Sequence, residues 1–401
     1  GGAATWVALI LGAACLLAVV GVAATRYLRP VPLLTARGEL ASRLTVPGPP
    51  PHIPWPSSGE AALMVPGLGL VGSSGPGQPV PTASVAKVMT ALMTLEAHPL
   101  VPGQPGPSVQ VDAADVSLYE ADLAQGESTV AVVAGESLSE RQLLEGLLIP
   151  SGNNIATLLG RWVAGSEASM VARANQEAAR MGLAATHFAD LSGFDPATVS
   201  TPTDLIRLGE AAMALPAFAG IVAMSSAVLP VAGRVANVNS ALGQDGLVGI
   251  KTGSDGPAGG CFLFVSRASV GGRPVRVFGA VLGVPTLADA LAAGRRLSRA
   301  AAAGLTVQRV VANGQEVGLY TVPWARGARA VVDADLVVLA WRGDVLRTRL
   351  ALVAVKAPLA RGAALGTVLA DLRGRTFRVP VRLADPISAP GPGWRVLRSP
   401  S

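Results

Sequence analysis

A chain of 401 residues is longer than one ordinary domain, so its length predicts two domains with additional segments. Half of the residues are hydrophobic, 14% are charged, and the formal net charge is +6. The basic residues form neither a run nor a patch interleaved with aromatic side chains, which argues against a nucleic-acid partner. A milder attraction to anionic lipid head groups or wall polymers is compatible with this charge.

Residues 1–25 predict a membrane segment, because they are apolar or small and contain no charge. About 20 such residues suffice to cross a bilayer, and the stretch exceeds the roughly 7–15 apolar residues of a signal peptide. The pattern therefore favours a transmembrane anchor over a cleaved signal segment. Cys15 lies inside this segment and cannot pair with Cys261, so we expect no disulfide framework.

Residues 26–58 predict an extended linker. Eight prolines fall between positions 30 and 56, a density that disfavours helices and central strands. The globular part begins near Gly59, where residues 60–65 and 68–71 predict a short pair of strands.

Residues 82–96 predict a largely buried helix, on which Ser84 and Lys87 share one face. A lysine amine can take a serine proton only when it is neutral, and burial lowers its pKa. The pair is either a nucleophile with its base or a chance Ser-x-x-Lys spacing. Lysine is scarce, with only Lys87, Lys251 and Lys356 in the chain, and arginine cannot replace a lysine base.

A second motif, Ser151-Gly152-Asn153, joins predicted helices over residues 138–149 and 155–163. It is either a helix cap with a turn, or a hydroxyl that relays a proton beside an amide that binds a peptide group.

A third motif, Lys251-Thr252-Gly253, follows a short apolar strand and precedes another strand over residues 261–266. Lysine and threonine here offer a cation and a hydroxyl to a carboxylate. Gly253 allows close approach of a substrate backbone, and a strand edge can pair with an extended peptide.

The last hundred residues predict a small all-β domain over 305–386, because short apolar runs alternate with turn residues. The predicted strands cover residues 307–311, 316–321, 328–332, 337–340, 348–355, 367–372 and 376–381. Residues 387–401 are rich in proline and predict an irregular tail.

The three motifs, in this order, resemble the signature of the penicillin-recognising serine hydrolases. Over residues 59–296 the chain resembles the serine D-Ala-D-Ala carboxypeptidases of peptidase family S11, the low-molecular-mass penicillin-binding proteins. Residues 181–195 and 200–205 also look like that family. Class A β-lactamases carry Asp where this chain has Gly152, and their deacylating Glu has no counterpart that we can place here.

The resemblance implies an α/β catalytic domain of the β-lactamase/transpeptidase-like fold over residues 59–300, with an antiparallel sheet flanked by helices and a helical subdomain. It implies that Ser84 is the nucleophile, Lys87 its base and Ser151 a proton carrier. It also implies substrate binding and an oxyanion site formed by backbone N–H groups, and it requires no metal or other cofactor. The implied substrate-binding residues are Asn153, Lys251, Thr252 and Gly253, and the implied oxyanion donors are Ser84 and Ser254.

The implied activity is removal of the terminal D-alanine from peptidoglycan stem peptides ending in D-Ala-D-Ala, with β-lactam antibiotics as acylating inhibitors. The alternatives are a β-lactamase or D,D-endopeptidase on the same scaffold, or an inactive wall-binding homologue, against which the intact motif residues argue. We expect a single-pass protein of the cell membrane with its catalytic domain outside the cytoplasm, or a secreted protein if the N-terminal segment is cleaved.

Overall fold

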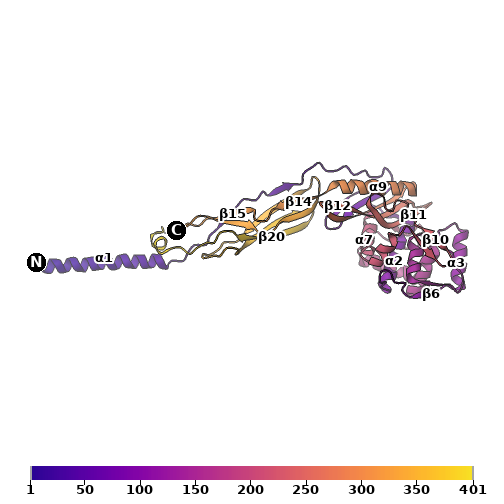
Figure 1. Ribbon diagram of the computed structural model, residues 1–401, viewed down its shortest axis with the longest axis horizontal. Helices are drawn as coiled ribbons and strands as arrows, with labels where there is room; N and C mark the ends of the chain where they lie inside the picture. The colour runs from indigo at the N-terminus through magenta and orange to yellow at the C-terminus, as the bar shows by residue number, and fades with distance from the viewer. Residues whose placement is uncertain (1, 400–401) are drawn as a thin grey trace. The chain divides into compact units, whose positions relative to one another are not determined.

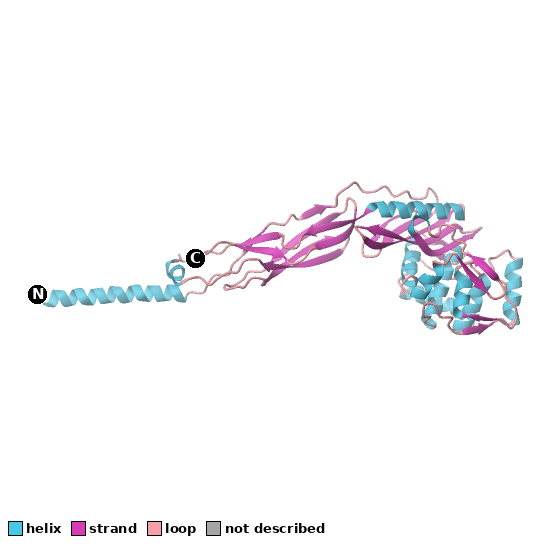
Figure 2. Ribbon diagram, in the orientation of Figure 1, coloured by secondary structure: helices cyan, strands magenta, loops and turns pink. Residues whose placement is uncertain are grey.

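The computed structural model describes residues 2–399, which divide into two units (Figure 1). The first unit combines the chain up to Pro49 with the chain from Val307 onward, and the second is Pro50–Thr306. Figure 2 shows that strands dominate the C-terminal part, whereas the second unit mixes a sheet with many helices. The three sequence motifs all lie in the second unit.

Helix α1 (Gly2–Leu28) has the properties of a membrane span. Its mean hydropathy reaches 2.7, and none of its residues is buried against the rest of the protein. At 1.5 Å per residue, 27 residues extend for about 40 Å, which exceeds the roughly 30 Å hydrocarbon core of a bilayer.

The second unit is built on a five-stranded antiparallel sheet in the order β11-β12-β13-β3-β4. The inner strand β12 contains the run Cys-Phe-Leu-Phe-Val and is buried there on both faces, as a continuous apolar run predicts. Phe262 and Phe264 lie close to Gly294 of α9, while Leu263 lies close to Gly209 of α7, so the two helices cover opposite faces. The strands are β3 (Glu60–Val65), β4 (Gly69–Ser74), β11 (Leu247–Asp255), β12 (Gly259–Val270) and β13 (Arg273–Val284).

Helices α2, α4, α5, α6, α7 and α8 share one hydrophobic core, in which α2 is the most deeply buried helix. Helix α2 contacts α4, α5 and α7, which fixes the residues at its start relative to the sheet. The helices are η1 (Ala83–Ala86), α2 (Lys87–Ala97), α3 (Ala113–Ala124), α4 (Glu140–Leu148), α5 (Asn153–Ala164), α6 (Glu167–Arg180), α7 (Pro202–Ala212), α8 (Pro216–Val222), η2 (Gln244–Gly246) and α9 (Leu287–Gly304).

Three two-stranded ladders tie the loops around these helices. They pair β5 (Val80–Pro81) with β8 (Val199–Ser200), β6 (Ser108–Gln110) with β7 (Ser137–Ser139), and β9 (Ser226–Leu229) with β10 (Gly233–Ala236). The first of them holds the chain immediately before Ser84 against the chain before α7.

The first unit contains a seven-stranded sheet in the order β1-β15-β16-β20-β19-β18-β2, together with the pair β14–β17. The all-β character expected for the C-terminal region is confirmed. The strands that follow residue 304 are β14 (Leu305–Val311), β15 (Glu316–Tyr320), β16 (Ala328–Val332), β17 (Leu336–Trp341), β18 (Val345–Leu352), β19 (Ala364–Leu372) and β20 (Arg375–Leu383).

The expectation that residues 26–58 form only a linker was wrong. Strands β1 (Ala36–Gly38) and β2 (Arg43–Thr45) occupy the two edges of the seven-stranded sheet, where they pair with β15 and β18. Both strands are free of proline, and an edge strand needs hydrogen bonds on one side alone. The prolines flank these strands rather than interrupt them.

The expectation of an irregular tail at residues 387–401 was also wrong, because α10 (Pro392–Leu397) is helical. Pro392 is the first residue of α10, where its missing N–H costs no helical hydrogen bond and its fixed φ suits the helix. This short helix lies beside the end of α1, and Arg398 donates hydrogen bonds to the carbonyls of Arg29 and Pro30.

Candidate active site

Ser84 and Lys87 meet at the junction of η1 and α2. The expected helix is not continuous, since a 3-10 turn carries Ser84 and the α-helix begins at Lys87. Lys87 is fully buried, and its Nζ is hydrogen-bonded to Ser84 Oγ at 2.7 Å, to Asn153 Oδ1 at 2.6 Å and to the carbonyl oxygen of Ser192 at 2.9 Å. Ser84 itself is half-buried, so a substrate can reach its hydroxyl.

Lys87 has a pKa well below its usual value. Burial is the main cause because it removes water from the ammonium form, and repulsion by Lys251 acts in the same direction. The carboxylates of Asp190, Glu127 and Asp122 oppose this shift. The balance favours the neutral amine that a general base requires.

The third motif lies on β11, an edge strand of the sheet that passes beside Ser84. A Cβ added to Gly253 would lie 2.9 Å from the backbone nitrogen of Ser84, so only glycine permits this approach. Lys251 is buried, and its Nζ donates to the carbonyl of Thr252 at 3.0 Å. Burial lowers the pKa of Lys251 to about 7. Ser254 follows and is exposed.

Ser151 and Asn153 lie on either side of the start of α5. Asn153 is its first residue and bridges two groups, because its Oδ1 accepts from Lys87 while its Nδ2 donates to Glu127. Ser151 has a positive φ of 74° and is 4% exposed. Its hydroxyl oxygen is buried and has no hydrogen-bond partner within residues 2–399, so it is not bonded to Lys87.

The loop after α6 also contributes to the site. Asp190 accepts hydrogen bonds from the Ser192 hydroxyl at 2.6 Å and from the backbone N–H groups of Gly193 and Phe194. This turn presents the Ser192 carbonyl to Lys87. A Cβ on Gly193 would lie 1.8 Å from the carbonyl of Ala83, so the loop packs directly on the nucleophile turn.

The predicted residues Ser84, Lys87 and Asn153 are thus joined by hydrogen bonds, and Gly253 lies beside them. Glu127, which accepts a hydrogen bond from the Asn153 amide, lies in a loop without a motif and was not predicted. Ser192 acts through its carbonyl, which any residue would provide. Asp190 lies within residues 181–195, which resemble the family, and Asp-Leu-Ser-Gly is typical of a turn closed by an aspartate side chain.

A profile of the D-alanyl-D-alanine carboxypeptidase family matches residues 70–286. The chain belongs to this family of serine D,D-peptidases, as the three motifs indicated. A D-alanyl-D-alanine carboxypeptidase, DacB2, from Mycobacterium tuberculosis is 36% identical over 201 residues, which are 48% of this chain and 64% of that protein. The D-alanyl-D-alanine carboxypeptidase of Streptomyces sp. strain K15 is 31% identical over 215 residues, which are 48% of this chain and 70% of that protein.

Solved structures agree with this assignment. Penicillin-binding protein 5 from Haemophilus influenzae has a TM-score of 0.60 at 20% identity, covering 86% of this chain and all of that one, and it therefore shows the fold. A Streptomyces K15 DD-transpeptidase has a TM-score of 0.54 at 26% identity, covering 61% of this chain and 97% of that one.

Proposed function

We propose that the chain is a serine D,D-carboxypeptidase that removes the terminal D-alanine from peptidoglycan stem peptides, and that β-lactams acylate it at Ser84. The observation that carries this proposal is the 2.7 Å hydrogen bond between Ser84 Oγ and the buried amine of Lys87. A serine beside a lysine of lowered pKa is an activated nucleophile.

In the acylation step, neutral Lys87 takes the hydroxyl proton while Ser84 Oγ bonds to the carbonyl carbon between the two D-alanines. The C–N bond then breaks, and the proton held by Lys87 passes through Ser151 to the departing amine, which leaves Lys87 neutral again. Water next attacks the ester and gives a proton to Lys87, and as the bond to Ser84 Oγ breaks, Lys87 passes this proton to the serine oxygen.

Backbone N–H groups of Ser84 and Ser254 hold the oxyanion in this proposal, and the adjacency of Gly253 to the Ser84 nitrogen supports it. Losing one such donor typically raises the barrier by ~3 kcal/mol. Asn153 holds the amide of the stem peptide, and the buried pair Lys251 and Thr252 binds the terminal carboxylate.

We further propose that α1 anchors the protein in the cell membrane with the catalytic unit outside the cytoplasm. The exposed apolar surface of α1 supports membrane insertion, and a wall substrate requires this sidedness. Partition of the full chain into a membrane fraction, with the catalytic unit accessible to added protease from outside the cell, tests this part.

The activity is tested by incubating the full chain with labelled penicillin and mapping the adduct. We expect the label on Ser84, its loss in Ser84→Ala, and its retention in the matched control Ser269→Ala, which changes an exposed serine of β12. Label that persists in Ser84→Ala contradicts the mechanism. Rapid release of hydrolysed penicillin would instead favour the β-lactamase alternative.

A further inference from the structure

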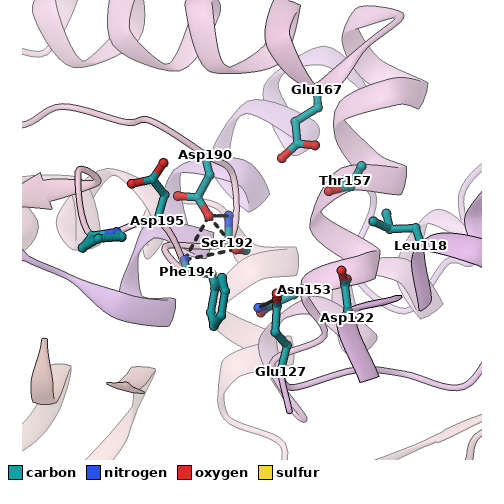
Figure 3. A pocket seen from close by; sticks show the side chains of 11 residues that line it. Leu118, Asp122, Glu127, Asn153, Thr157, Glu167, Asp190, Ser192, Phe194 and Asp195 are labelled. Atoms are coloured by element: carbon teal, nitrogen blue, oxygen red, sulfur yellow. Dashed lines mark hydrogen bonds between the residues drawn. The ribbon is translucent and has the colours of Figure 1, made fainter. Parts of the chain in front are cut away.

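An acidic pocket of about 430 Å³ opens beside the active site (Figure 3). Asn153 lines it and is hydrogen-bonded to Lys87 through Oδ1 and to Glu127 through Nδ2. Side chains from α3, α5, the first turn of α6 and the loop after α6 line it. Five of its lining residues are carboxylic acids, and none of the described residues that line it is Lys, Arg or His. The five acids are Asp122, Glu127, Glu167, Asp190 and Asp195.

Four of these acids already have hydrogen-bond partners. Asp190 accepts from the N–H and hydroxyl groups of its own turn, and Glu127 accepts from Asn153. Asp195 accepts from the N–H of Ala197, and Glu167 is hydrogen-bonded to Thr157. Burial, followed by repulsion from Glu127, raises the pKa of Asp122 to about 6, and burial is also the main cause of the raised pKa of Glu167.

Asp122 is the strongest sign of an absent partner. The residue is only 7% exposed, and its side chain points into the pocket (Figure 3). Within the described chain its carboxylate makes no hydrogen bond and no ion pair. A buried carboxylate without a partner is costly, so a ligand that supplies a cation would remove that cost.

The arrangement of the acids favours an organic cation over a metal ion. Nowhere in residues 2–399 do three His, Cys, Asp or Glu side chains converge closely enough to hold a metal. The carboxylates instead line different walls of a space that is large enough for a flexible side chain.

The position of the pocket places it near the part of the proposed substrate that precedes the two D-alanines. Asn153 is shared by the pocket and the catalytic site, and Lys251 and Thr252 lie on another element, β11. If those two residues bind the terminal carboxylate, Asn153 lies on the acyl side of the bond to be cut. A side chain preceding the two D-alanines would then enter the pocket.

We infer that the pocket binds a protonated primary amine on the side chain of the residue that precedes the two D-alanines. This inference rests on the proposed function and specifies its substrate class. The enzyme would prefer stem peptides whose side-chain amine is free, and would discriminate against peptides whose amine is acylated, as it is in a cross-link.

The test compares two tripeptides, Nα-acetyl-L-Lys-D-Ala-D-Ala with a free side-chain amine and the same peptide acetylated on that amine. For the full chain in detergent, we expect kcat/KM for D-alanine release to favour the free amine by about tenfold, the value of one buried charge pair. Asp122→Asn should reduce this ratio to about threefold or less. The matched control Glu120→Gln removes an exposed carboxylate from the same helix and should preserve the ratio.

A wild-type ratio near one, or an unchanged ratio in Asp122→Asn that still reacts with labelled penicillin, overturns the inference. Binding of both peptides to Ser84→Ala, measured by calorimetry, separates this failure from that of the proposed function. If neither peptide is hydrolysed but the free amine binds more tightly, the proposed function fails and the pocket assignment stands. If both peptides bind equally, the pocket assignment fails whatever the turnover.

Discussion

Lys87 and Lys251 are both buried, yet the proposed chemistry needs one of them neutral and the other charged. The lowered pKa of Lys87 makes it a base, whereas Lys251 must keep its proton to attract a carboxylate. Repulsion between the two favours this division, because a charged Lys251 disfavours the ammonium form of Lys87.

The pH profile of kcat/KM should therefore be bell-shaped. Activity rises as pH passes the lowered pKa of Lys87 and falls as Lys251 loses its proton near pH 7. Lys251→Arg keeps the positive charge at all these pH values, so the falling limb should move upward by more than one pH unit. Measurement between pH 4.5 and 9.5 decides this, and an unmoved falling limb would rule out Lys251 as its origin.

Lys87→Arg should abolish general base catalysis, because arginine stays protonated. We expect the rate constant for acylation by labelled penicillin to fall on the order of 10³-fold, within the range typical of a lost general base. Lys356→Arg, at the exposed third lysine, is the control and should react at the wild-type rate. Comparable acylation in the two variants would argue against Lys87 as the base.

Among single residues, the sequence predicted those site residues that stand in motifs and have distinctive side-chain chemistry. Ser84, Lys87 and Asn153 stand in motifs, and the spacing on a helix brings the first two together. Glu127 and Asp122 were not predictable, because nothing local marks them and only the tertiary fold brings them near Lys87. The free hydroxyl of Ser151 also depends on its backbone conformation, with φ at 74°.

Among the elements, β11 must approach the nucleophile turn closely. Gly253→Ala would place a Cβ 2.9 Å from the Ser84 nitrogen and displace one or both backbones. We expect acylation to fall by about 10²-fold, as for loss of one oxyanion donor, with little change in thermal stability. Gly256→Ala, in the turn after β11 where an added Cβ meets nothing within 4 Å, is the control. Equal acylation rates in both variants would contradict this geometry.

Helix α4 begins with a buried carboxyl group, that of Glu140. It is 0% exposed, both of its oxygens lack hydrogen-bond partners within residues 2–399, and burial raises its pKa to about 7. Between pH 4.5 and about 7 the unfolded chain loses this proton while the folded chain keeps it, so stability falls as pH rises.

Glu140→Gln should remove this pH-dependent loss. At pH 8 we expect the variant to be more stable than the wild type by about 3 kcal/mol, and at pH 4 we expect the two to be nearly equal. Urea unfolding of the full chain at both pH values, following the transition that bound penicillin shifts, measures the difference. A gain of the same size at pH 4 would mean that the proton on Glu140 is not responsible.

The strands after residue 304 were predicted, as were β3, β4, β11 and β12 of the five-stranded sheet, whereas β13 was not. The predictions that the structure overturns concern short elements. Strands β1 and β2 have three residues each, too few for an alternating pattern, and their stability comes from the partner strands. Helix α10 was missed because its proline was taken as a breaker, although at the first position of a helix proline is favourable.

For the whole molecule, the pairing of β1 and β2 makes the N-terminal region part of the β-sheet. A chain that begins at Leu33 keeps both edge strands, whereas one that begins at Pro50 exposes β15 and β18. Since both lack α1, the comparison isolates the strands. We expect the shorter chain to lose at least about 5 °C in the melting of its β-rich unit and to self-associate through the open edges. Identical melting and monomeric elution of both chains would show that the edge strands are dispensable.

The interleaved order of the two units also sets the sequence of events during synthesis. Because β1 and β2 are made first and β20 last, the whole of Pro50–Thr306 is an insertion within the sheet that they share. All strands and helices of the inserted unit are synthesised before the central strands of the seven-stranded sheet. The inserted unit can therefore fold while β1 and β2 are still unpaired. The seven-stranded sheet then assembles last. A chain truncated before β20 would therefore contain a folded Pro50–Thr306 unit and an incomplete sheet.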